Sequence, residues 1–263
     1  MLTEERHDRI RGELSRKGKV LAAQLAVDFG VSEDTVRRDL REMARMGLCR
    51  RVYGGALSPA PDLGTIQTRS AILSEAKHRL GAAIGELLKS GQTIFIDAGS
   101  TNITIAGAIP VDTQLTVITN APSIALALEN HEKCRTILLG GIFSPSKGAC
   151  LGGQVLREAQ QIFADIFILG ACGIDAEIGL TALDAEEAEL KRCMIEQSNQ
   201  LWVPVTVDKI GTVAPYKIAD ASAIGKLFAV SDDEGALTLP FSEKGIVVHE
   251  VRSNYFARKL DGG

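Results

Sequence analysis

The sequence predicts an α/β chain with two parts: a small helical part at the N-terminus that ends in a β-hairpin, and a larger part built on a mostly parallel sheet. Up to about residue 58, apolar residues recur three or four positions apart, the spacing of one helical face, and Gly54 and Gly55 interrupt an alternating stretch. From about Thr68 onward, short apolar runs alternate with amphipathic helical segments. Such runs are typical of parallel strands that helices cover on both faces.

The bulk composition is that of an ordinary globular protein. Of the 263 residues, 45% are hydrophobic and 24% are charged, which argues against disorder and leaves room for two domains. No apolar run approaches the roughly 18 residues of a membrane span. The N-terminus carries Glu4, Glu5 and Arg6 where a secretory signal would be apolar. We therefore expect a cytoplasmic protein with no membrane partner.

The residue types that hold metals or form disulfides are scattered. The five cysteines (Cys49, Cys134, Cys150, Cys172 and Cys193) are odd in number and form no C-x-x-C pair, so we expect reduced, mostly buried thiols. The four histidines are dispersed, and no nucleophile–base pair is recognisable. We expect no metal, no cofactor and no catalytic residue.

The charge of the chain is unevenly distributed. The net charge is −4, but residues 1–58 hold 12 Lys and Arg against 9 Asp and Glu, a balance of +3, and the remainder holds 17 against 24, or −7. A basic end joined to an acidic body is typical of a protein that contacts a phosphate backbone through one end only.

The N-terminal part reads as a helix-turn-helix followed by a hairpin. Ile10 and Leu14 share one face of a first helix, and a second helix that carries Leu21, Leu25 and Phe29 stops at Gly30. Ser32 is a suitable N-cap for a third helix, whose inward stripe is Val36, Leu40 and Met43. The stretch Leu48–Ala56 alternates around a Gly-Gly turn and predicts a wing. We expect a winged helix-turn-helix domain over residues 1–57.

Several polar side chains of this part are placed to contact DNA. The second helix of such a motif lies in the major groove, where arginine bridges guanine O6 and N7 and hydroxyls reach bases or phosphates. Spacing alone does not separate this interpretation from a solvated surface. The candidates are Ser32, Glu33, Thr35, Arg37 and Arg38 on the helix, and Arg50, Arg51 and Tyr53 on the wing.

The second part begins after a stretch with no periodicity. Pro59, Pro61 and neighbouring small or polar residues indicate a linker, which we assign to residues 58–74. A second domain is expected over residues 75–263. Its predicted strands are Thr93–Ile96, Leu115–Thr119, Thr136–Leu139, Ile166–Leu169, Leu201–Val207, Leu227–Val230 and Ile246–Val251.

Small or polar turns follow several of these strands. In open parallel sheets, ligands collect beyond the carboxyl ends of the strands, and a hydroxyl-rich turn at a helix N-terminus suits a phosphate. Convergence of these turns on one edge predicts a pocket. Its candidates are Asp97, Gly99, Ser100 and Thr101 after one strand, Asn120 after the next, then Gly140 and Gly141, and finally Gly173 and Asp175.

Glu187 and Lys191 lie four residues apart on one face of a helix predicted over Asp184–Ser198. A surface ion pair of little consequence explains this spacing. A carboxylate for sugar hydroxyls and an ammonium for a phosphate explain it as well, and spacing alone favours the first.

Ordered motifs along nearly the whole chain resemble one family of transcription regulators. V-S-E-D-T-V-R-R-D-L (31–40) and G-L-C-R-R-V-Y-G-G-A (47–56) resemble the DNA-binding signature of the DeoR family. The turns D-A-G-S-T (97–101), T-N (119–120), G-G (140–141) and G-A-C-G-I-D (170–175), with E-A-E-L-K-R (187–192), resemble its sensor domain in the same order. Tyr53 departs mildly from the family, which often has His at this position.

The resemblance implies a sensor similar in fold to ribose-5-phosphate isomerase and CoA-transferases that binds phosphorylated sugars or related metabolites. It also implies that Arg69 and Lys77, at positions often basic in the family, face the pocket, with Glu187 and Lys191. In V-T-V-D-K-I-G (205–211), Lys209 keeps its family place. Thr206 replaces the usual Asp, and Asp208 stands where Ser is common, so the charge of the pocket should differ from the family norm.

Taken together, these features predict a DNA-binding transcriptional regulator, a repressor of a carbohydrate-catabolism operon controlled by a phosphorylated sugar. Its partners would be double-stranded operator DNA and that sugar phosphate, and paired half-sites imply a homodimer or homotetramer. One alternative is a sugar-phosphate isomerase or transferase with an appended winged helix, for which Asp97, Glu187 and Asp208 are the acid–base candidates. Another is a protein-interaction module that uses the winged helix as a dimer contact.

Overall fold

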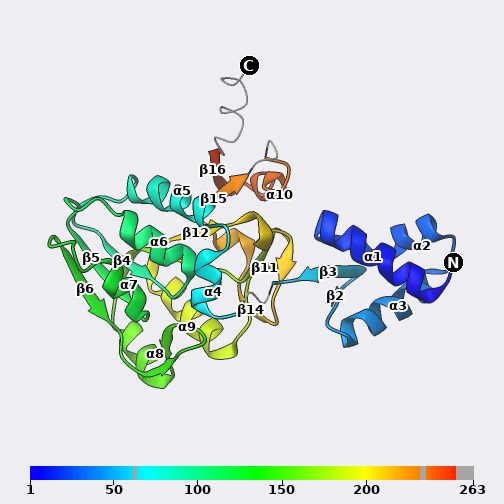
Figure 1. The fold of residues 1–263 in the computed structure, drawn as a ribbon, viewed down its shortest axis with the longest axis horizontal. Helices are drawn as coiled ribbons and strands as arrows, with labels where there is room; N and C mark the ends of the chain where they lie inside the picture. The colour runs from blue at the N-terminus through cyan, green and yellow to red at the C-terminus, as the bar shows by residue number, and fades with distance from the viewer. Residues whose placement is uncertain (62–63, 232–234, 253–263) are drawn as a thin grey trace, which may run out of the picture.

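A computed structural model describes residues 1–61, 64–231 and 235–252. Figure 1 shows a small helical part and a larger α/β part, joined where strand β3 (Gly55–Pro59) runs from one to the other. The predicted fold class is confirmed. Residues 253–263 of the predicted second domain lie outside the described residues.

The N-terminal part is a winged helix-turn-helix. Helices α1 (Thr3–Lys17), α2 (Ala22–Phe29) and α3 (Glu33–Arg45) enclose a core in which Ile10, Val36, Leu40 and Met43 are at most 1% exposed. As predicted, Ser32 caps α3, because its hydroxyl accepts a hydrogen bond of 3.2 Å from the Thr35 amide. Strand β2 (Arg50–Val52) pairs antiparallel with β3 to form the wing.

A third strand, β1 (Lys19–Leu21), was not predicted. The sequence pattern places Leu21 on the buried face of the second helix, but Leu21 lies in β1 and is 56% exposed. The strand pairs with β3, so that Leu21 faces Gly55. A pairing between residues more than thirty positions apart leaves no local signal in three residues of sequence.

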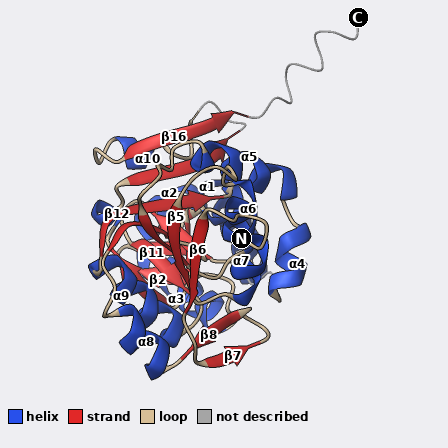
Figure 2. Ribbon diagram, turned by 90° about the vertical axis from the view of Figure 1, so that its left-hand side faces the viewer, coloured by secondary structure: helices blue, strands red, loops and turns tan. Residues whose placement is uncertain are grey.

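The larger part is built on a seven-stranded sheet in the order β16-β15-β12-β9-β4-β5-β6, and every neighbouring pair is parallel (Figures 1 and 2). All seven predicted strands are present, with bounds that shift by a few residues. They are β4 (Thr93–Ile96), β5 (Leu115–Thr119), β6 (Cys134–Leu138), β9 (Ala164–Ile168), β12 (Ser198–Val205), β15 (Lys226–Ser231) and β16 (Val247–Arg252).

Helices cover both faces of this sheet. Ile94 and Ile96 of β4 join one core cluster and Phe95 between them joins the other, because alternate side chains of a strand point to opposite faces. The first cluster includes residues of α5 (Ser74–Gly85), α6 (Ser100–Ala108) and α7 (Pro122–Ala127). The second includes residues of α8 (Gly153–Ala159) and α9 (Ala185–Glu196).

Several short elements follow the carboxyl ends of the parallel strands. They comprise the hairpin β7 (Ile142–Ser144) and β8 (Ala149–Leu151), and the antiparallel strands β10 (Gly173–Asp175), β11 (Gly179–Ala182) and β14 (Tyr216–Ala219). The single turn η1 (Val207–Lys209) leads into β13 (Thr212–Val213). A second turn, η2 (Ala221–Ala223), and the short helix α10 (Leu239–Ser242) complete the described elements.

The segment predicted as a linker, residues 58–74, contains regular structure. Ser58 and Pro59 belong to β3 and pair in parallel with Thr212 and Val213 of β13. Farther on, Thr65 caps α4 (Ile66–Ala71) by accepting a hydrogen bond from the Thr68 amide. Composition indicated a linker because neither element has a periodic apolar face of its own.

Two other expectations concern the whole chain. The cysteines are free thiols, of which Cys49, Cys150 and Cys193 are buried, as predicted. None of the helices within the described residues has the length and apolar character that a membrane span requires.

Candidate functional site

The winged helix carries exposed arginines on α3 and on the wing. Arg37 and Arg38 project from the first two turns of α3, and Arg50 and Arg51 from the wing; all four are exposed. Tyr53, at the tip of the wing, is fully exposed. A groove of about 160 Å³ between the helix and the wing is lined by Arg37, Arg51 and Tyr53 among others. The structure thus brings helix and wing candidates together on one surface.

Carboxylates of the same helix pair with Arg37 and Arg38. The guanidinium of Arg37 donates two hydrogen bonds, of 3.1 and 2.7 Å, to Glu33, one helical turn earlier. Arg38 lies 3.7 Å from Asp34. Such exposed pairs contribute little to stability, so both guanidinium groups remain available to other partners. Ser32 and Thr35 hydrogen bond to each other through their hydroxyls at 2.8 Å.

Asp39, within the R-R-D-L motif, is not a DNA contact but an anchor. It is 3% exposed and accepts hydrogen bonds of 2.6 and 2.9 Å from Nε and Nη2 of Arg6 on α1. A bidentate pair of this kind fixes orientation as well as distance. The Arg6–Asp39 pair therefore sets the angle of the recognition helix on α1, a role that the sequence pattern did not predict.

The second candidate site lies at the carboxyl edge of the parallel sheet. β4 and β9 are neighbours, but the chain leaves β4 toward β5 and leaves β9 toward β12, so the strand order reverses between them. Ligands of open α/β sheets bind at such a reversal. Asp97 follows β4 and Gly170 follows β9, and the Gly170 amide donates a hydrogen bond of 2.7 Å to the Asp97 carboxylate.

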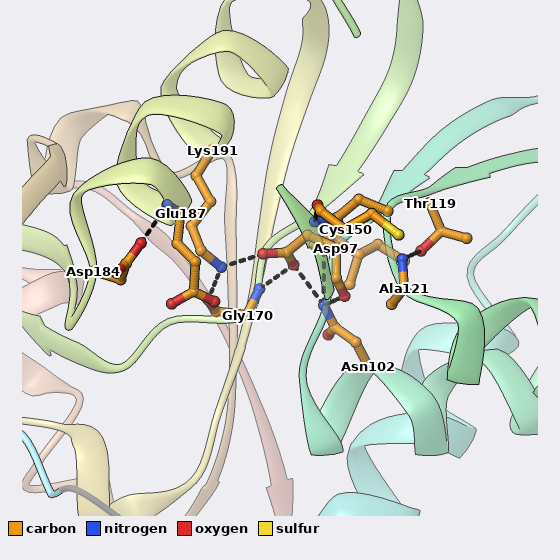
Figure 3. Close-up of polar contacts among 11 residues, drawn as sticks. Asp97, Asn102, Thr119, Ala121, Cys150, Gly170, Asp184, Glu187 and Lys191 are labelled. Atoms are coloured by element: carbon orange, nitrogen blue, oxygen red, sulfur yellow. Dashed lines mark hydrogen bonds and ion pairs between the residues drawn. The ribbon is translucent and has the colours of Figure 1, made fainter. Parts of the chain in front are cut away.

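Lys191 completes this centre from α9. Its ammonium donates to the Asp97 carboxylate and, at 2.7 Å, to the Gly170 carbonyl (Figure 3). Both side chains are at most 5% exposed. Burial alone would lower the pKa of Lys191, but Asp97 and Glu187 outweigh burial and raise it. The pair Glu187 and Lys191 is thus no surface ion pair, since Lys191 is a buried cation with a carboxylate partner.

Asn102 is a member of this centre that sequence reasoning missed. It is fully buried, and its amide donates to the Asp97 main chain at 2.9 Å, to the Asp97 carboxylate at 2.8 Å and to the Ile168 carbonyl at 3.1 Å (Figure 3). Its position, one residue after the D-A-G-S-T turn, was the available signal. The Asp97 carboxylate thus accepts hydrogen bonds from three groups of the protein itself, Asn102, Gly170 and Lys191.

Three more cations gather beside the pair. Lys209 of η1 has Cys172, Asp208, Arg69 and Lys191 as electrostatic neighbours, and burial lowers its pKa. Lys77, 4% exposed, has a pKa lowered to about 8, first by burial and then by the charge of Lys209. Arg69, from α4, is a charge neighbour of both lysines. Lys209 and Arg69 both lower the pKa of Lys77, and Arg69 also lowers that of Lys209, so positive charge is concentrated here.

The three cations differ in what holds them. Lys77 donates to the carbonyls of Arg69 and Ile72, so it closes the C-terminal end of α4. Within the described residues, the Lys209 ammonium has no hydrogen bond or ion pair, and the Nε atom of Arg69 is buried without a partner. Lys209 and Arg69 therefore retain donors for a ligand.

Other polar atoms around this edge also lack partners. The Thr101 hydroxyl, the side-chain carbonyl of Asn120 and one carboxylate oxygen of Asp208 are buried without a hydrogen bond in the described residues. Asp97, Asn120, Glu187 and Lys191 together line a small cavity of about 10 Å³. Gly99, two residues after Asp97, is the N-cap residue of α6, and Ser100 is the first residue of that helix.

Four other predicted pocket residues make packing and turn contacts. Gly140 and Gly141 pack against the hairpin and α8; the Gly140 amide donates to Glu158, and a side chain at Gly141 would meet Val155. Gly173 packs against Thr212 of β13, and Asp175 holds its own turn by accepting from the amides of Glu177 and Ile178. Within the described residues, none of these contacts involves Asp97 or Lys191.

Known proteins match this chain over nearly its whole length. A family model of the DeoR C-terminal sensor domain matches residues 73–231, and a model of the DeoR-like helix-turn-helix domain matches residues 6–62. The glycerol-3-phosphate regulon repressor of Escherichia coli (strain K12) is 32% identical over 225 residues, 85% of this chain and 89% of the relative. The L-fucose operon activator of Haemophilus influenzae is 31% identical over 218 residues, 82% of this chain and 87% of the relative.

A solved structure of ribose 5-phosphate isomerase A from Methanocaldococcus jannaschii is similar to 52% of this chain, with a TM-score of 0.39 and 14% identity, over 54% of the isomerase. The winged helix and the parallel-sheet domain define a two-domain transcription regulator. The chain belongs to the DeoR family, as its motifs predicted. Since the relatives are transcriptional regulators, the enzyme alternative is not favoured.

Proposed function

We propose that the chain represses a carbohydrate-catabolism operon in the cytoplasm and leaves its operator when a phosphorylated sugar or polyol binds the larger domain. The observation that carries the proposal is the group of cations at the carboxyl edge of the sheet, where Lys209 and Arg69 have donors to spare. The name of one relative, a glycerol-3-phosphate regulon repressor, supports a small phosphorylated metabolite as the signal, and that of another, an L-fucose operon activator, supports a carbohydrate operon.

The proposed DNA contacts are made by the exposed arginines of α3 and the wing. Arg37 and Arg38 read base edges from the start of α3, and Arg50, Arg51 and Tyr53 grip the adjacent backbone from the wing. Ser32, Thr35 and Glu33 position this helix end, because the two hydroxyls bond to each other and the Glu33 carboxylate accepts from Arg37. Paired half-sites require paired winged helices, so the active form is a homodimer or homotetramer.

The effector contacts divide between charge and hydroxyl recognition. A sugar phosphate carries a charge of about −1.5 to −2. Lys209, Arg69 and the Gly99–Thr101 turn bind its phosphate group. Asn120 and Glu187 accept from the sugar hydroxyls. Asp97 and Lys191 neutralise each other through their hydrogen bond. They therefore position the residues that contact the ligand and do not contact it themselves. Lys77 acts in the same indirect way, by holding the end of α4 that carries Arg69.

Asp208 gives this site its own selectivity. Within the described residues, its carboxylate keeps one buried oxygen without a partner, and it is a charge neighbour of Lys209. A second phosphate at this position would be repelled. We therefore expect a ligand with a single phosphate and with a hydroxyl near Asp208.

Thermal-shift screening of phosphorylated sugars against their unphosphorylated parents tests the effector site. A ligand at one hundred times its Kd stabilises the protein by ~2.7 kcal/mol, so a phosphorylated compound should raise Tm and its parent should not. Lys209→Ala should abolish the rise. Lys217→Ala removes the same charge from an exposed lysine paired with Asp220 and should leave the rise intact. A rise that survives Lys209→Ala would refute this site.

A further inference from the structure

The two domains are joined by strand pairing as well as by the chain. β3 is the central strand of the winged-helix sheet, flanked by β1 and β2, and its end pairs in parallel with β13 of the sensor domain. The Ala60 amide donates a hydrogen bond of 2.8 Å to the Val213 carbonyl. One strand therefore belongs to both domains, and β13 cannot shift without moving it.

β13 is fastened in turn to the candidate effector site. It begins three residues after Lys209, and the Thr212 hydroxyl donates to the Lys209 carbonyl at 2.9 Å. The Gly211 amide donates at 2.7 Å to Ile174 of β10, which continues from the Gly170 turn. On the other strand, β3 leads through the connection into α4 and Arg69. Each strand of the β3–β13 pair thus leads to one cation that has donors to spare.

Backbone touches backbone at this junction. A Cβ atom on Gly18, which ends α1, would lie 2.8 Å from the Gly211 carbonyl oxygen. The Ser58 amide donates at 2.7 Å to the Gly18 carbonyl, and the Ser58 hydroxyl at 3.2 Å to Leu14 of α1. Contacts between main-chain atoms do not absorb a displacement as flexible side chains do, so they transmit it.

Space lies directly beside the contact. A cavity of about 570 Å³ separates the two domains there, lined by Leu14 and Ser58 on one side and by Asp208, Gly211 and Phe241 on the other. η1 borders this cavity through Asp208, and the next residue, Lys209, has Arg69 and Lys191 as charge neighbours. The winged helix therefore meets the sensor along a narrow strand contact with room to move.

We propose that the β3–β13 pair is the element through which the effector site controls the winged helix. The proposal rests on the effector site proposed above. Without an anion, Arg69, Lys77 and Lys209 repel one another; a bound phosphate removes this repulsion and draws η1 and α4 together. β13 and β3 move with them, and the winged helix turns on the sensor because α1 and the wing are bonded to β3. An effector acts in this way only through its different affinity for the two arrangements.

The test uses the full chain and inorganic phosphate, the group that every phosphorylated sugar shares. Calorimetry first measures phosphate binding in the wild type and in Lys209→Ala. Amide hydrogen exchange is then compared with and without saturating phosphate at constant ionic strength. Exchange at Ser58, Ala60 and Gly211 should change on the order of threefold or more, while amides inside α3 keep their rates because the winged helix moves as a body.

A matched pair of variants isolates the junction. Gly18 and Gly47 have similar left-handed φ values of 71° and 74°, but a Cβ at Gly47 meets nothing within 4 Å. Gly18→Ala and Gly47→Ala should both bind phosphate with wild-type affinity, since neither residue touches the site. The phosphate response at Ser58 and Ala60 should disappear in Gly18→Ala and persist in Gly47→Ala.

The outcomes separate the two proposals. Absence of phosphate binding in the wild type, or binding undiminished in Lys209→Ala, overturns the effector site and this inference together. Binding that depends on Lys209 but leaves exchange at Ser58, Ala60 and Gly211 unchanged in the wild type overturns the inference and leaves the site standing. An unaltered response in Gly18→Ala has the same consequence.

Discussion

The buried Asp97–Lys191 pair illustrates how context decides the role of a residue. From the sequence, Lys191 is the ammonium that binds the phosphate and Asp97 is free to accept from hydroxyls. In the structure these two side chains bond to each other, and Gly170 and Asn102 saturate Asp97 further. Lys209 and Arg69, which the sequence indicates only through a family resemblance, retain the unused donors.

Breaking this pair should destabilise the protein strongly. Lys191→Met leaves the Asp97 carboxylate buried without its cation, a change that typically costs about 3–5 kcal/mol. Replacing both residues, as in Asp97→Asn with Lys191→Met, should cost less than the single change. Chemical denaturation measures both variants. If Lys191→Met unfolds like the wild type and yet loses sugar-phosphate binding, Lys191 is a ligand contact and not a structural partner of Asp97.

Substitutions of Arg37 and Arg51 should affect DNA affinity in different ways. Arg37→Ala removes a base-reading side chain and should cost ~1–3 kcal/mol of operator affinity, with relaxed preference at one base pair. Arg51→Ala removes a backbone contact, so it should weaken binding to all sequences and flatten the salt dependence. Fluorescence anisotropy with operator and scrambled DNA across a salt series distinguishes them. Equal affinity of the wild type and both variants at low salt would refute the winged helix as the DNA contact.

At the scale of the element, sequence periodicity predicted those helices and strands whose apolar pattern is contained in their own residues. The strand Thr93–Ile96 and the inward stripe of α3 are present as predicted because a fully buried strand and an amphipathic helix each carry their pattern within a few residues. β1 and β13 have two or three residues each and exist through pairing with β3. Their formation depends on partners far along the chain, which no local pattern encodes.

The candidate site was predicted to a similar degree. The turns after β4 and β5 do meet at one edge, since parallel strands present their carboxyl ends together. Four other predicted residues also follow strands, but they pack against the hairpin, α8 and β13 or hold a turn: Gly140, Gly141, Gly173 and Asp175. Strand ends predict an edge, whereas tertiary contacts decide which turns on that edge face the ligand.

Helix α4 provides a prediction about pH. Lys77 closes its C-terminal end, with a pKa lowered from 10.5 to about 8, first by burial. Between these two values the unfolded chain binds more protons than the folded chain, so the contribution of Lys77 to stability rises as the pH is raised through this window. The difference in free energy of unfolding between wild type and Lys77→Met should increase from pH 8 toward 10.5. A difference that is flat with pH would show that Lys77 is not perturbed.

At the scale of the molecule, two sites lie on separate domains that share one strand. The basic end meets DNA, the acidic body holds a buried group of cations, and the β3–β13 pair lies between them. By linkage, an effector that weakens operator binding must itself bind more weakly to the operator complex, by the same factor. This reciprocity ties the two candidate sites into a single thermodynamic account.

Titration of an operator complex with a sugar phosphate tests the central claim most directly. A labelled fragment from the region upstream of the protein's own gene is bound by the full chain, and the phosphorylated compound that raises Tm most is added. The account predicts release of the fragment, unaffected release in Lys217→Ala, and no release in Lys209→Ala, which should still bind the fragment in the absence of the compound. A complex that persists at saturating compound in the wild type, or that dissociates equally in Lys209→Ala, would contradict it.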